Sequence, residues 1–384
     1  MPCDFDFLPD RRNTECAKWR QYDDDVLPMW VADMDFLSPE PVIRALRERV
    51  EHGVFGYPCE PDELKQVIID RLAQKYQWTV TPEDVLIMPG VVNGVNLASQ
   101  ALAKPGDGVL IQTPVYPPFF DASRHAGAIS QQVELARGAD GSYSIDFDQF
   151  EQAITGQTRI FILCNPHNPV GRAFRADELE KMAEICLRHG VVICSDEIHC
   201  DLVFSGHRHI PIAALNPEIA QNTITLMAPS KTYNIAGLSC SFAVIQNKAL
   251  RRTFLGAGRG LISMVNILGQ VAALAAFKDS QSWLDELLCY LQANRDFLYE
   301  YVKQELPGMS MGLPEATYLA WLDCRQLDLQ GQNPHDFFLE KGRVAMNKGN
   351  DFGSSGQGFV RLNFGCPQPM LVEALERMKK ALAG

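Results

Sequence analysis

Short runs of consecutive apolar residues alternate with amphipathic stretches through the middle of the chain. Between two of these runs, residues 175–190 place apolar side chains at helical spacing and end at a glycine, which predicts a helix. A second helix is expected over 38–53, where Ser38 can cap the first turn, Pro39 suits the first turn and Gly53 ends it. Five runs are expected to be buried β-strands: 109–113, 159–164, 191–195, 223–227 and 241–245.

Fully apolar strands separated by helices predict an α/β fold with a mostly parallel sheet that is covered on both faces. The length of 384 residues favours two domains. We expect a large domain over 41–275 and a smaller α+β domain over 276–384, where long helices precede two strand-like runs, 317–324 and 358–364. The irregular first part, 1–40, is expected to be an arm that joins the small domain.

The composition is that of an ordinary globular protein, with 46% hydrophobic and 21% charged residues. No apolar run is long enough to span a membrane, and the first residues do not resemble a signal peptide. The net charge of −12 argues against nucleic acid or an anionic membrane as a partner. The 11 cysteines include no C-x-x-C pair, and several lie inside apolar runs, which suits a reducing cytoplasm. Neither cysteines nor histidines show zinc-ligand spacing, so no metal site is expected.

Polar residues follow four of the predicted strands at the point where each strand ends. The carboxyl ends of parallel strands meet at one edge of a sheet, where ligands bind in open α/β folds. Each residue type has an ordinary structural use, because an aspartate often caps a helix and Asn-Pro often forms a turn. Their coincidence at one edge nevertheless predicts a site. The residues concerned are Tyr116, Asn168, Asp196, His199 and Lys231.

These side chains suit pyridoxal 5'-phosphate (PLP). Lys231 could form a Schiff base with the cofactor, since a desolvated or cation-flanked lysine is partly unprotonated and therefore nucleophilic. Asp196 could keep the ring nitrogen protonated, which the ring needs in order to accept electrons. Asn168 and His199 could donate to the phenolate oxygen, and Tyr116 could cover the ring face.

A phosphate group needs backbone N–H donors, such as those at the start of a helix. The sequence "MPGVVNGVNLASQALA" offers Gly90, Val91 and Val92 where a helix begins, and Ser230 could add its hydroxyl. A glycine before a helix is weak support by itself.

The segments "NPHNPVG", "SDEIH" and "PSKTYNIAGL", in this order, resemble class I/II PLP-dependent enzymes of the aspartate-aminotransferase fold. The resemblance covers essentially the whole chain and implies fold type I of the PLP-dependent transferases. The segments "LPMWVADMDF", "GYP" and "FVRLNFGCP" narrow it to the MalY/PatB-type carbon–sulfur β-lyases, which resemble cystathionine β-lyase in activity.

The resemblance implies the same five roles at the strand ends and adds others. Arg361 would bind the α-carboxylate of the substrate, a task that suits a planar, two-pronged cation, although an arginine in a strand is otherwise expected to form a surface ion pair. Tyr57 would reach the cofactor phosphate of a neighbouring subunit, which implies a homodimer with shared active sites. Phe5, Trp30 and Tyr57 are candidates for the lining of the distal substrate pocket.

Two positions depart from the aminotransferase pattern. Aminotransferases of this fold usually carry an arginine eight residues after the lysine, where this chain has Ser239. Many of them have tyrosine where this chain has His199. Both departures favour the lyase branch, and the first leaves the full set of phosphate contacts open. The prolines of "NPHNP" are candidates for cis peptide bonds.

The function expected from the resemblance is α,β-elimination of L-cystathionine or a related cysteine thioether to a thiol, pyruvate and ammonia. An aminotransferase is the main alternative, because it shares these residues up to the removal of the α-proton. A regulatory protein that retains the site is a second alternative. A nicotinamide dehydrogenase is disfavoured, since no G-x-G-x-x-G follows the first strand. The sequence leaves open which sulfur amino acid is the substrate.

Overall fold

The computed structural model describes residues 3–59 and 61–384. Within these residues, the largest sheet has seven strands: β2 (Val85–Met88), β3 (Gly108–Thr113), β4 (Ile129–Glu134), β7 (Thr158–Cys164), β8 (Val192–Asp196), β9 (Thr223–Met227) and β10 (Ser241–Val244). Their spatial order is β2-β10-β9-β8-β7-β3-β4. The strand β10 alone runs opposite to the other six. The expected α/β fold with a mostly parallel sheet is confirmed.

The five expected strands are β3, β7, β8, β9 and β10, each within one residue of the predicted ends. The strands β2 and β4 were not expected from the sequence. The strand β4 lies at the edge of the sheet and has only one buried residue, Val133. It therefore lacks the continuous apolar run of a strand that is covered on both faces.

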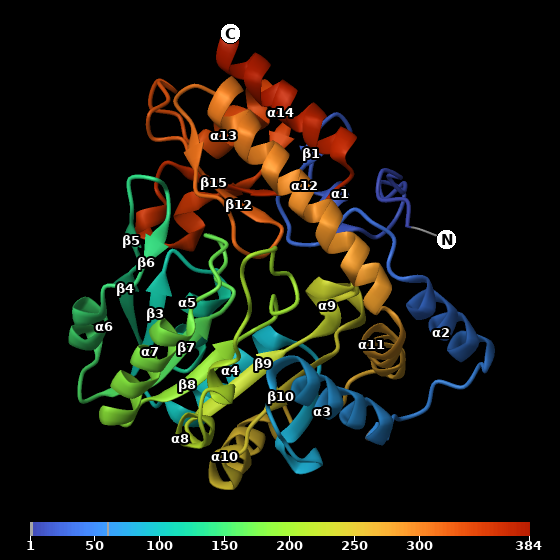
Figure 1. Cartoon of the computed structure of the whole chain (residues 1–384), viewed down its shortest axis with the longest axis vertical. Helices are drawn as coiled ribbons and strands as arrows, with labels where there is room; N and C mark the ends of the chain where they lie inside the picture. Colours follow the sequence, from blue (N-terminus) through green and yellow to red (C-terminus); the bar gives the residue numbers. More distant parts are fainter. Residues whose placement is uncertain (1–2, 60) are drawn as a thin grey trace.

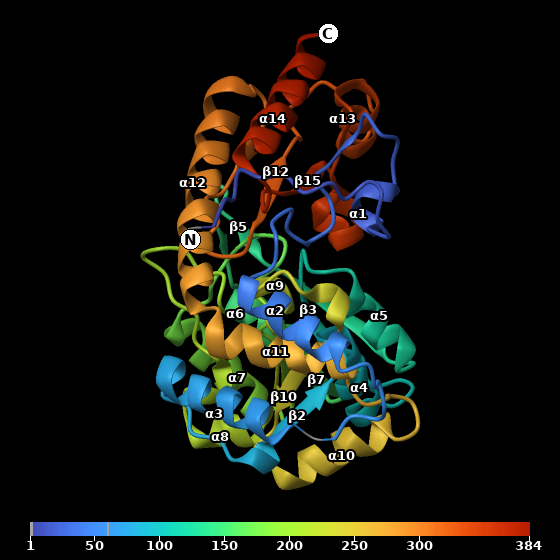
Figure 2. The same cartoon turned by 90° about the vertical axis from the view of Figure 1, so that its right-hand side faces the viewer.

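Helices cover both faces of the sheet because side chains alternate along each strand. Ile162 of β7 packs in one apolar cluster with α4 (Val91–Leu102), whereas its neighbour Leu163 packs in another with α7 (Ala176–Arg188). Figures 1 and 2 show the sheet with these helices as the lower body of the molecule. The other helices around it are α2 (Glu40–Glu51), α3 (Asp62–Tyr76), α5 (Pro118–His125), α6 (Phe147–Ala153), α8 (Pro217–Gln221), α9 (Pro229–Thr232), α10 (Lys248–Gly258) and α11 (Ile267–Asp279).

The helix expected over 175–190 is α7, and it is followed by a glycine with positive φ. The helix expected over 38–53 is the shorter α2, and the expectation that Ser38 caps it is wrong. Pro39 occupies the cap position. The Ser38 hydroxyl instead donates to the carbonyl oxygen of Asn234 at 3.0 Å. This tertiary contact uses the hydroxyl that would otherwise cap the helix.

After α11 the chain forms the upper body in Figure 1. An antiparallel sheet has the order β11-β12-β15-β14, and β12 and β15 are the two strands expected in this region. The elements are α12 (Gln281–Glu305), β11 (Ser310–Met311), β12 (Leu319–Asp323), α13 (Pro334–Gly342), β13 (Val344–Ala345), β14 (Asn347–Lys348), β15 (Phe359–Asn363) and α14 (Gln368–Ala383).

The N-terminal segment lies beside these C-terminal elements (Figures 1 and 2). It contains α1 (Ala17–Arg20) and β1 (Leu27–Pro28), and β1 pairs in parallel with β13. The short hairpin β5 (Ala136–Arg137) and β6 (Tyr143–Ser144) stands apart from the main sheet. The pairing of β1 with β13 supports the expected arm, while the domain boundaries near 40 and 275 stay predictions. Of the helices in the described ranges, none is long and apolar enough to cross a membrane.

Candidate active site

The residues expected at the strand ends share one cavity of about 250 Å³. It opens where β7, β8 and β9 end, as expected for a parallel sheet. Its lining includes Gly90, Val91, Val92, Tyr116, Asn168, Asp196, His199, Ser230 and Lys231. Ser239, the position that departs from the aminotransferase pattern, also lines it.

Lys231 lies in the short helix α9, directly after β9. Its amine donates a hydrogen bond of 2.6 Å to the carbonyl oxygen of Ala32. Burial, together with the nearby charge of Arg361, lowers the pKa of Lys231 to about 8. About a tenth of the amine is therefore unprotonated at pH 7, far more than for an ordinary lysine, and a nucleophile or base requires this form.

Asp196 is the last residue of β8 and His199 follows it by three positions; both line the cavity and are buried. Burial raises the pKa of Asp196 to about 7, although its carboxylate accepts a hydrogen bond of 3.1 Å from the N–H of Ile198. A cationic N–H donor in the cavity would stabilise the ionised form. Burial lowers the pKa of His199 to about 3, so its ring is neutral at physiological pH. Among the described residues, the His199 Nδ1 atom has no hydrogen-bond partner.

Arg361 projects from β15 and is held by three oxygen acceptors. Its Nη1 donates to Asn168 Oδ1 at 2.9 Å, and its Nη2 donates to Asn347 Oδ1 at 2.6 Å and to the Trp30 carbonyl at 3.0 Å. Because the amide oxygen of Asn168 accepts this hydrogen bond from Arg361, the amide nitrogen of Asn168 is the group that can donate into the cavity. Burial lowers the pKa of Arg361 to about 10, which still leaves it cationic at neutral pH.

The start of α4 faces the same cavity. Gly90 occupies the cap position without a side-chain cap, so the first backbone N–H groups of the helix lack intrahelical partners. Such a helix start favours an anion. The Ser230 hydroxyl donates to the Cys240 carbonyl at 3.4 Å, a long contact that a ligand could replace.

Two of the expected substrate-pocket residues lie elsewhere. Trp30 does not line the cavity, although its carbonyl holds Arg361, and its indole donates to the Lys18 carbonyl at 3.1 Å. Phe5 packs against Phe36 and two aromatic residues of α12. The arm therefore approaches the site through its backbone rather than through these rings.

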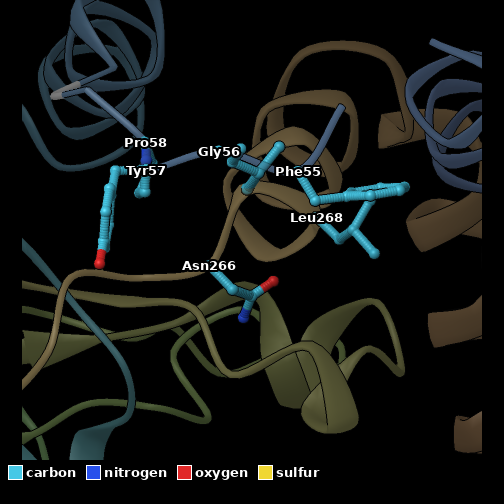
Figure 3. Close-up of a pocket in the computed structure, with 7 residues that line it drawn as sticks. Phe55, Gly56, Tyr57, Pro58, Asn266 and Leu268 are labelled. Carbon is cyan, nitrogen blue, oxygen red and sulfur yellow. The ribbon is translucent and has the colours of Figure 1, made fainter. Parts of the chain in front are cut away.

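Tyr57 is also separate from the cavity and fully exposed within the single chain. With Phe55 it borders a surface hollow of about 370 Å³ that is mainly apolar (Figure 3). Asn266 and Leu268, at the start of α11, form its other side. Tyr57 does not contact Lys231 of the same chain. Its expected role at the cofactor phosphate therefore depends on a second subunit.

Neither the carbonyl of Ala32 nor the side chain of Asn347 was expected at the site. The segment "MWVADMDF" was recognised only as a family feature. A backbone carbonyl carries no side-chain signal, and an asparagine in a polar stretch is unremarkable. Both bonds of Asn-Pro in "NPHNP" are cis, at Asn165–Pro166 and Asn168–Pro169.

A family model described as aminotransferase class I and II matches residues 24–378. The chain therefore belongs to this family, and the expected resemblance is confirmed.

Individual relatives match over nearly the whole chain. The cystathionine beta-lyase PatB of Bacillus subtilis is 39% identical over 99% of this chain and 100% of its own length. A solved structure of OvoB is 43% identical, with a TM-score of 0.95 and coverage of 99% of both chains. Cystalysin from Treponema denticola, solved with a pyridoxal 5'-phosphate cofactor, is 33% identical, with a TM-score of 0.95 over 100% of this chain and 99% of its own.

Proposed function

We propose that this protein is a PLP-dependent carbon–sulfur β-lyase that acts on L-cystathionine or a related cysteine thioether. The observation that carries the proposal is the cavity that Lys231, Asp196 and Asn168 line together, with the buried Arg361 directly behind it. Arg361 does not line the cavity itself, but its Nη1 donates to Asn168 Oδ1 at 2.9 Å. The name of the relative PatB and the cofactor in cystalysin support the same reaction class.

The residues fit PLP as their resident cofactor. Lys231 would hold it covalently, and Asp196 would pair with the ring nitrogen, a cationic donor of the kind that a buried carboxylate needs. His199, whose Nδ1 has no partner within the described part of the chain, and the amide of Asn168 would face the phenolate oxygen, while Tyr116 would lie against the cofactor ring. The phosphate would bind at the start of α4, with Val91, Val92 and Ser230.

When bound, PLP supplies an electron sink for the charge that develops at Cα of the amino acid. Arg361 would bind the α-carboxylate, and its Nε atom, which has no acceptor among the described residues, is a donor available for it. This grip orients the Cα–H bond toward Lys231. The amine of the substrate would first replace Lys231 on the cofactor. The freed Lys231 amine, with its pKa near 8, would then take the α-proton as a general base.

Loss of that proton allows the bond between Cβ and sulfur to break, and the thiolate leaves with the bonding electron pair. The thiolate gains a proton to become the thiol. In the net reaction, one thioether and one water give one thiol, one pyruvate and one ammonia. No oxidant or second amino acid is consumed.

We further infer that the protein forms a homodimer whose two subunits share their active sites. We also infer that it is located in the cytoplasm. Exposed apolar side chains gather around Tyr57 and in the segment before α11, including Val54, Phe55, Leu261 and Met264. A face of this kind commonly marks a protein interface. A second copy on it would bury Tyr57, which is otherwise fully exposed. The cysteines are unpaired, which suits a reducing compartment.

The test is incubation of the PLP-loaded protein with L-cystathionine in the absence of any keto acid. Pyruvate and free thiol should appear in equal amounts over many turnovers. If neither forms, but an added keto acid restores turnover with an amino donor, the protein is an aminotransferase. The protein without substrate and the Lys231→Ala variant are the controls.

A further inference from the structure

The backbone of residues 30–33 contacts both cationic side chains of the proposed site. The carbonyl of Ala32 accepts from the Lys231 amine at 2.6 Å, and the carbonyl of Trp30 accepts from Arg361 Nη2 at 3.0 Å. The position of this short segment therefore affects the proposed base and the proposed carboxylate-binding group together.

The segment lies outside any helix or strand, so its carbonyls depend mainly on side chains for hydrogen bonds, although the N–H of Asp33 also donates to the carbonyl of Val31 at 2.9 Å. Asn363 Nδ2 donates to the carbonyls of Val31 and Asp33 at 2.6 and 2.7 Å. The Tyr318 hydroxyl donates to the carbonyl of Ala32 at 2.9 Å. Each carbonyl from residue 30 to residue 33 thus has a side-chain donor, and together these donors fix the segment.

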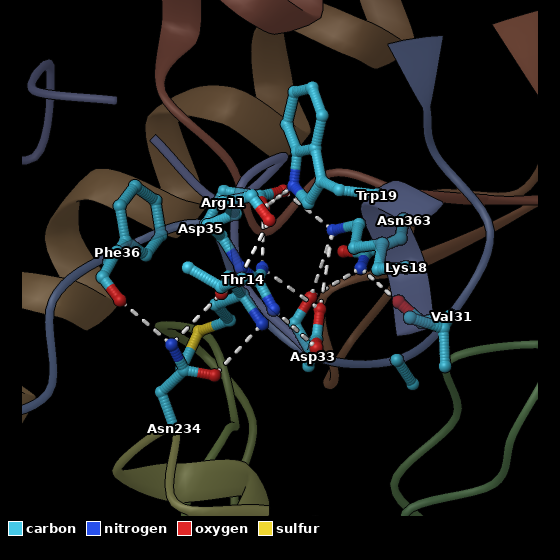
Figure 4. Close-up of polar contacts among 12 residues, drawn as sticks. Arg11, Thr14, Lys18, Trp19, Val31, Asp33, Asp35, Phe36, Asn234 and Asn363 are labelled. Carbon is cyan, nitrogen blue, oxygen red and sulfur yellow. Dashed lines mark hydrogen bonds and ion pairs between the residues drawn. The ribbon is translucent and has the colours of Figure 1, made fainter. Parts of the chain in front are cut away.

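A buried carboxylate anchors the end of this segment to the N-terminal arm (Figure 4). Asp35 is 0% exposed and accepts from Lys18 Nζ at 2.6 Å, from Trp19 Nε1 at 2.7 Å and from Arg11 Nη1 at 2.5 Å. Lys18 is buried as well, and it also donates to the carbonyl of Asp33 at 3.1 Å. The same ammonium group therefore joins Asp35 to the segment that faces the cavity.

We propose that Asp35 is a positioning residue that, through Lys18 and Arg11, sets the place of the 30–33 backbone against Lys231 and Arg361. The inference rests on the proposed function and adds a residue outside the cavity to it. Removing one partner of a buried ion cluster leaves the others uncompensated, so the cluster must rearrange. Lys18 then has to leave its position, and the carbonyls of Ala32 and Trp30 move with the chain.

If Asp35 had only a structural role, replacing it would lower the stability of the protein without changing the pH at which Lys231 titrates. A carbonyl acceptor stabilises the protonated nitrogen of Lys231, so loss of the Ala32 contact should favour the unprotonated form. The charged groups facing this nitrogen are Arg361, Asp33 and Asp196. Arg361 and Asp196 lie outside the Asp35 cluster, whereas Asp33 shares Arg11 and Lys18 with Asp35 and moves with the segment. One hydrogen bond to a charged group corresponds to a shift of about one pH unit.

The experiment compares Asp35→Asn with Asp25→Asn in the PLP-loaded, full-length protein. Asp25 is a matched control, because it also forms an arm ion pair, with Arg343, but is 64% exposed. The visible absorbance of the bound cofactor is titrated with pH, since it reports the proton at Lys231 Nζ. The kcat and KM for L-cystathionine are measured in parallel.

We expect Asp35→Asn to move the absorbance midpoint toward lower pH by about one unit and to lower kcat/KM about tenfold. Asp25→Asn should leave both unchanged. The inference is overturned if folded Asp35→Asn protein keeps the midpoint and kcat/KM of the wild type. If Asp35→Asn does not fold, Trp19→Phe decides the matter in the same way, since the Trp19 indole donates to Asp35 Oδ1 at 2.7 Å and phenylalanine lacks this donor.

Failure of the proposed function is a separate outcome. It would appear as a wild-type protein that releases no pyruvate from L-cystathionine. The absorbance titration would still test the positioning role, because it needs only bound PLP and not a particular reaction.

Discussion

The amine of Lys231 donates a hydrogen bond of 2.6 Å to the carbonyl of Ala32, 199 positions earlier in the chain. The first residues after β1 thus form part of the wall around the group on which the proposed chemistry depends. The site is built from the strand ends of the large sheet, from β15 and from the N-terminal arm. Its parts come together only when the whole chain folds.

Replacing Lys231 by alanine should abolish elimination. Loss of a positioned general base lowers the rate about 10³-fold or more, and here the covalent attachment point is lost too. Pyruvate release from L-cystathionine and the visible absorbance of the cofactor measure the two effects. Lys341→Ala, which changes an exposed lysine of α13, is the control. Retention of more than a small fraction of the turnover would contradict the role given to Lys231.

Replacing Arg361 by lysine should mainly raise KM. Lysine keeps the charge but loses the planar pair of donors that fits a carboxylate, so kcat/KM should fall about 10²-fold. Cofactor content should stay near the wild-type level, because Arg361 does not contact the start of α4, where phosphate would bind, and the amide nitrogen of Asn168 remains available to the cofactor. Steady-state kinetics with L-cystathionine measure the change. An unchanged KM would show that the carboxylate binds elsewhere.

Asp196 should make the cofactor-free protein less stable as the pH rises. Burial raises its pKa from the ordinary 3.8 to about 7, so between these values the folded state holds a proton that the unfolded chain has lost. This contribution to stability is complete below pH 4 and is lost as the pH rises through 7, by about 4 kcal/mol at most. The Asp196→Asn variant lacks this dependence.

Urea unfolding of the two cofactor-free proteins at pH 5 and pH 7.5 measures this difference. The stability of Asp196→Asn relative to the wild type should increase between the two pH values. If the difference in unfolding free energy between the two proteins is the same at both pH values, Asp196 does not titrate in this range. The same substitution should impair elimination in the loaded enzyme, because the ring nitrogen loses its carboxylate partner.

Mixing two inactive variants should restore activity if Tyr57 serves the neighbouring subunit. A dimer of one Lys231→Ala chain and one Tyr57→Ala chain contains one site with both residues intact. Random exchange of equal amounts should give about a quarter of the wild-type activity. Each variant refolded alone is the control. No gain after exchange, with a dimer shown by light scattering, would place Tyr57 outside the shared site.

The amino-acid sequence alone was enough to locate the main elements and the residues at the strand ends. Continuous apolar runs are needed wherever a strand is covered on both faces, so β3, β7, β8 and β9 could be located from their composition. Parallel strands end at the same edge of a sheet, so the residues directly after them lie at that edge. For this reason Asn168, Asp196 and Lys231 were expected to meet, and they do.

The contacts between polar atoms far apart in the chain emerged only from the tertiary structure. The carbonyls of Ala32 and Trp30 have no side-chain signature, and their contacts with Lys231 and Arg361 depend on where the arm packs. Ser38 is a residue type that often caps a helix, yet its hydroxyl donates to the carbonyl of Asn234, far away in the chain. Local patterns predict elements because they act through near neighbours. The anchoring of the arm by Asp35 depends on groups that the folded chain alone brings together.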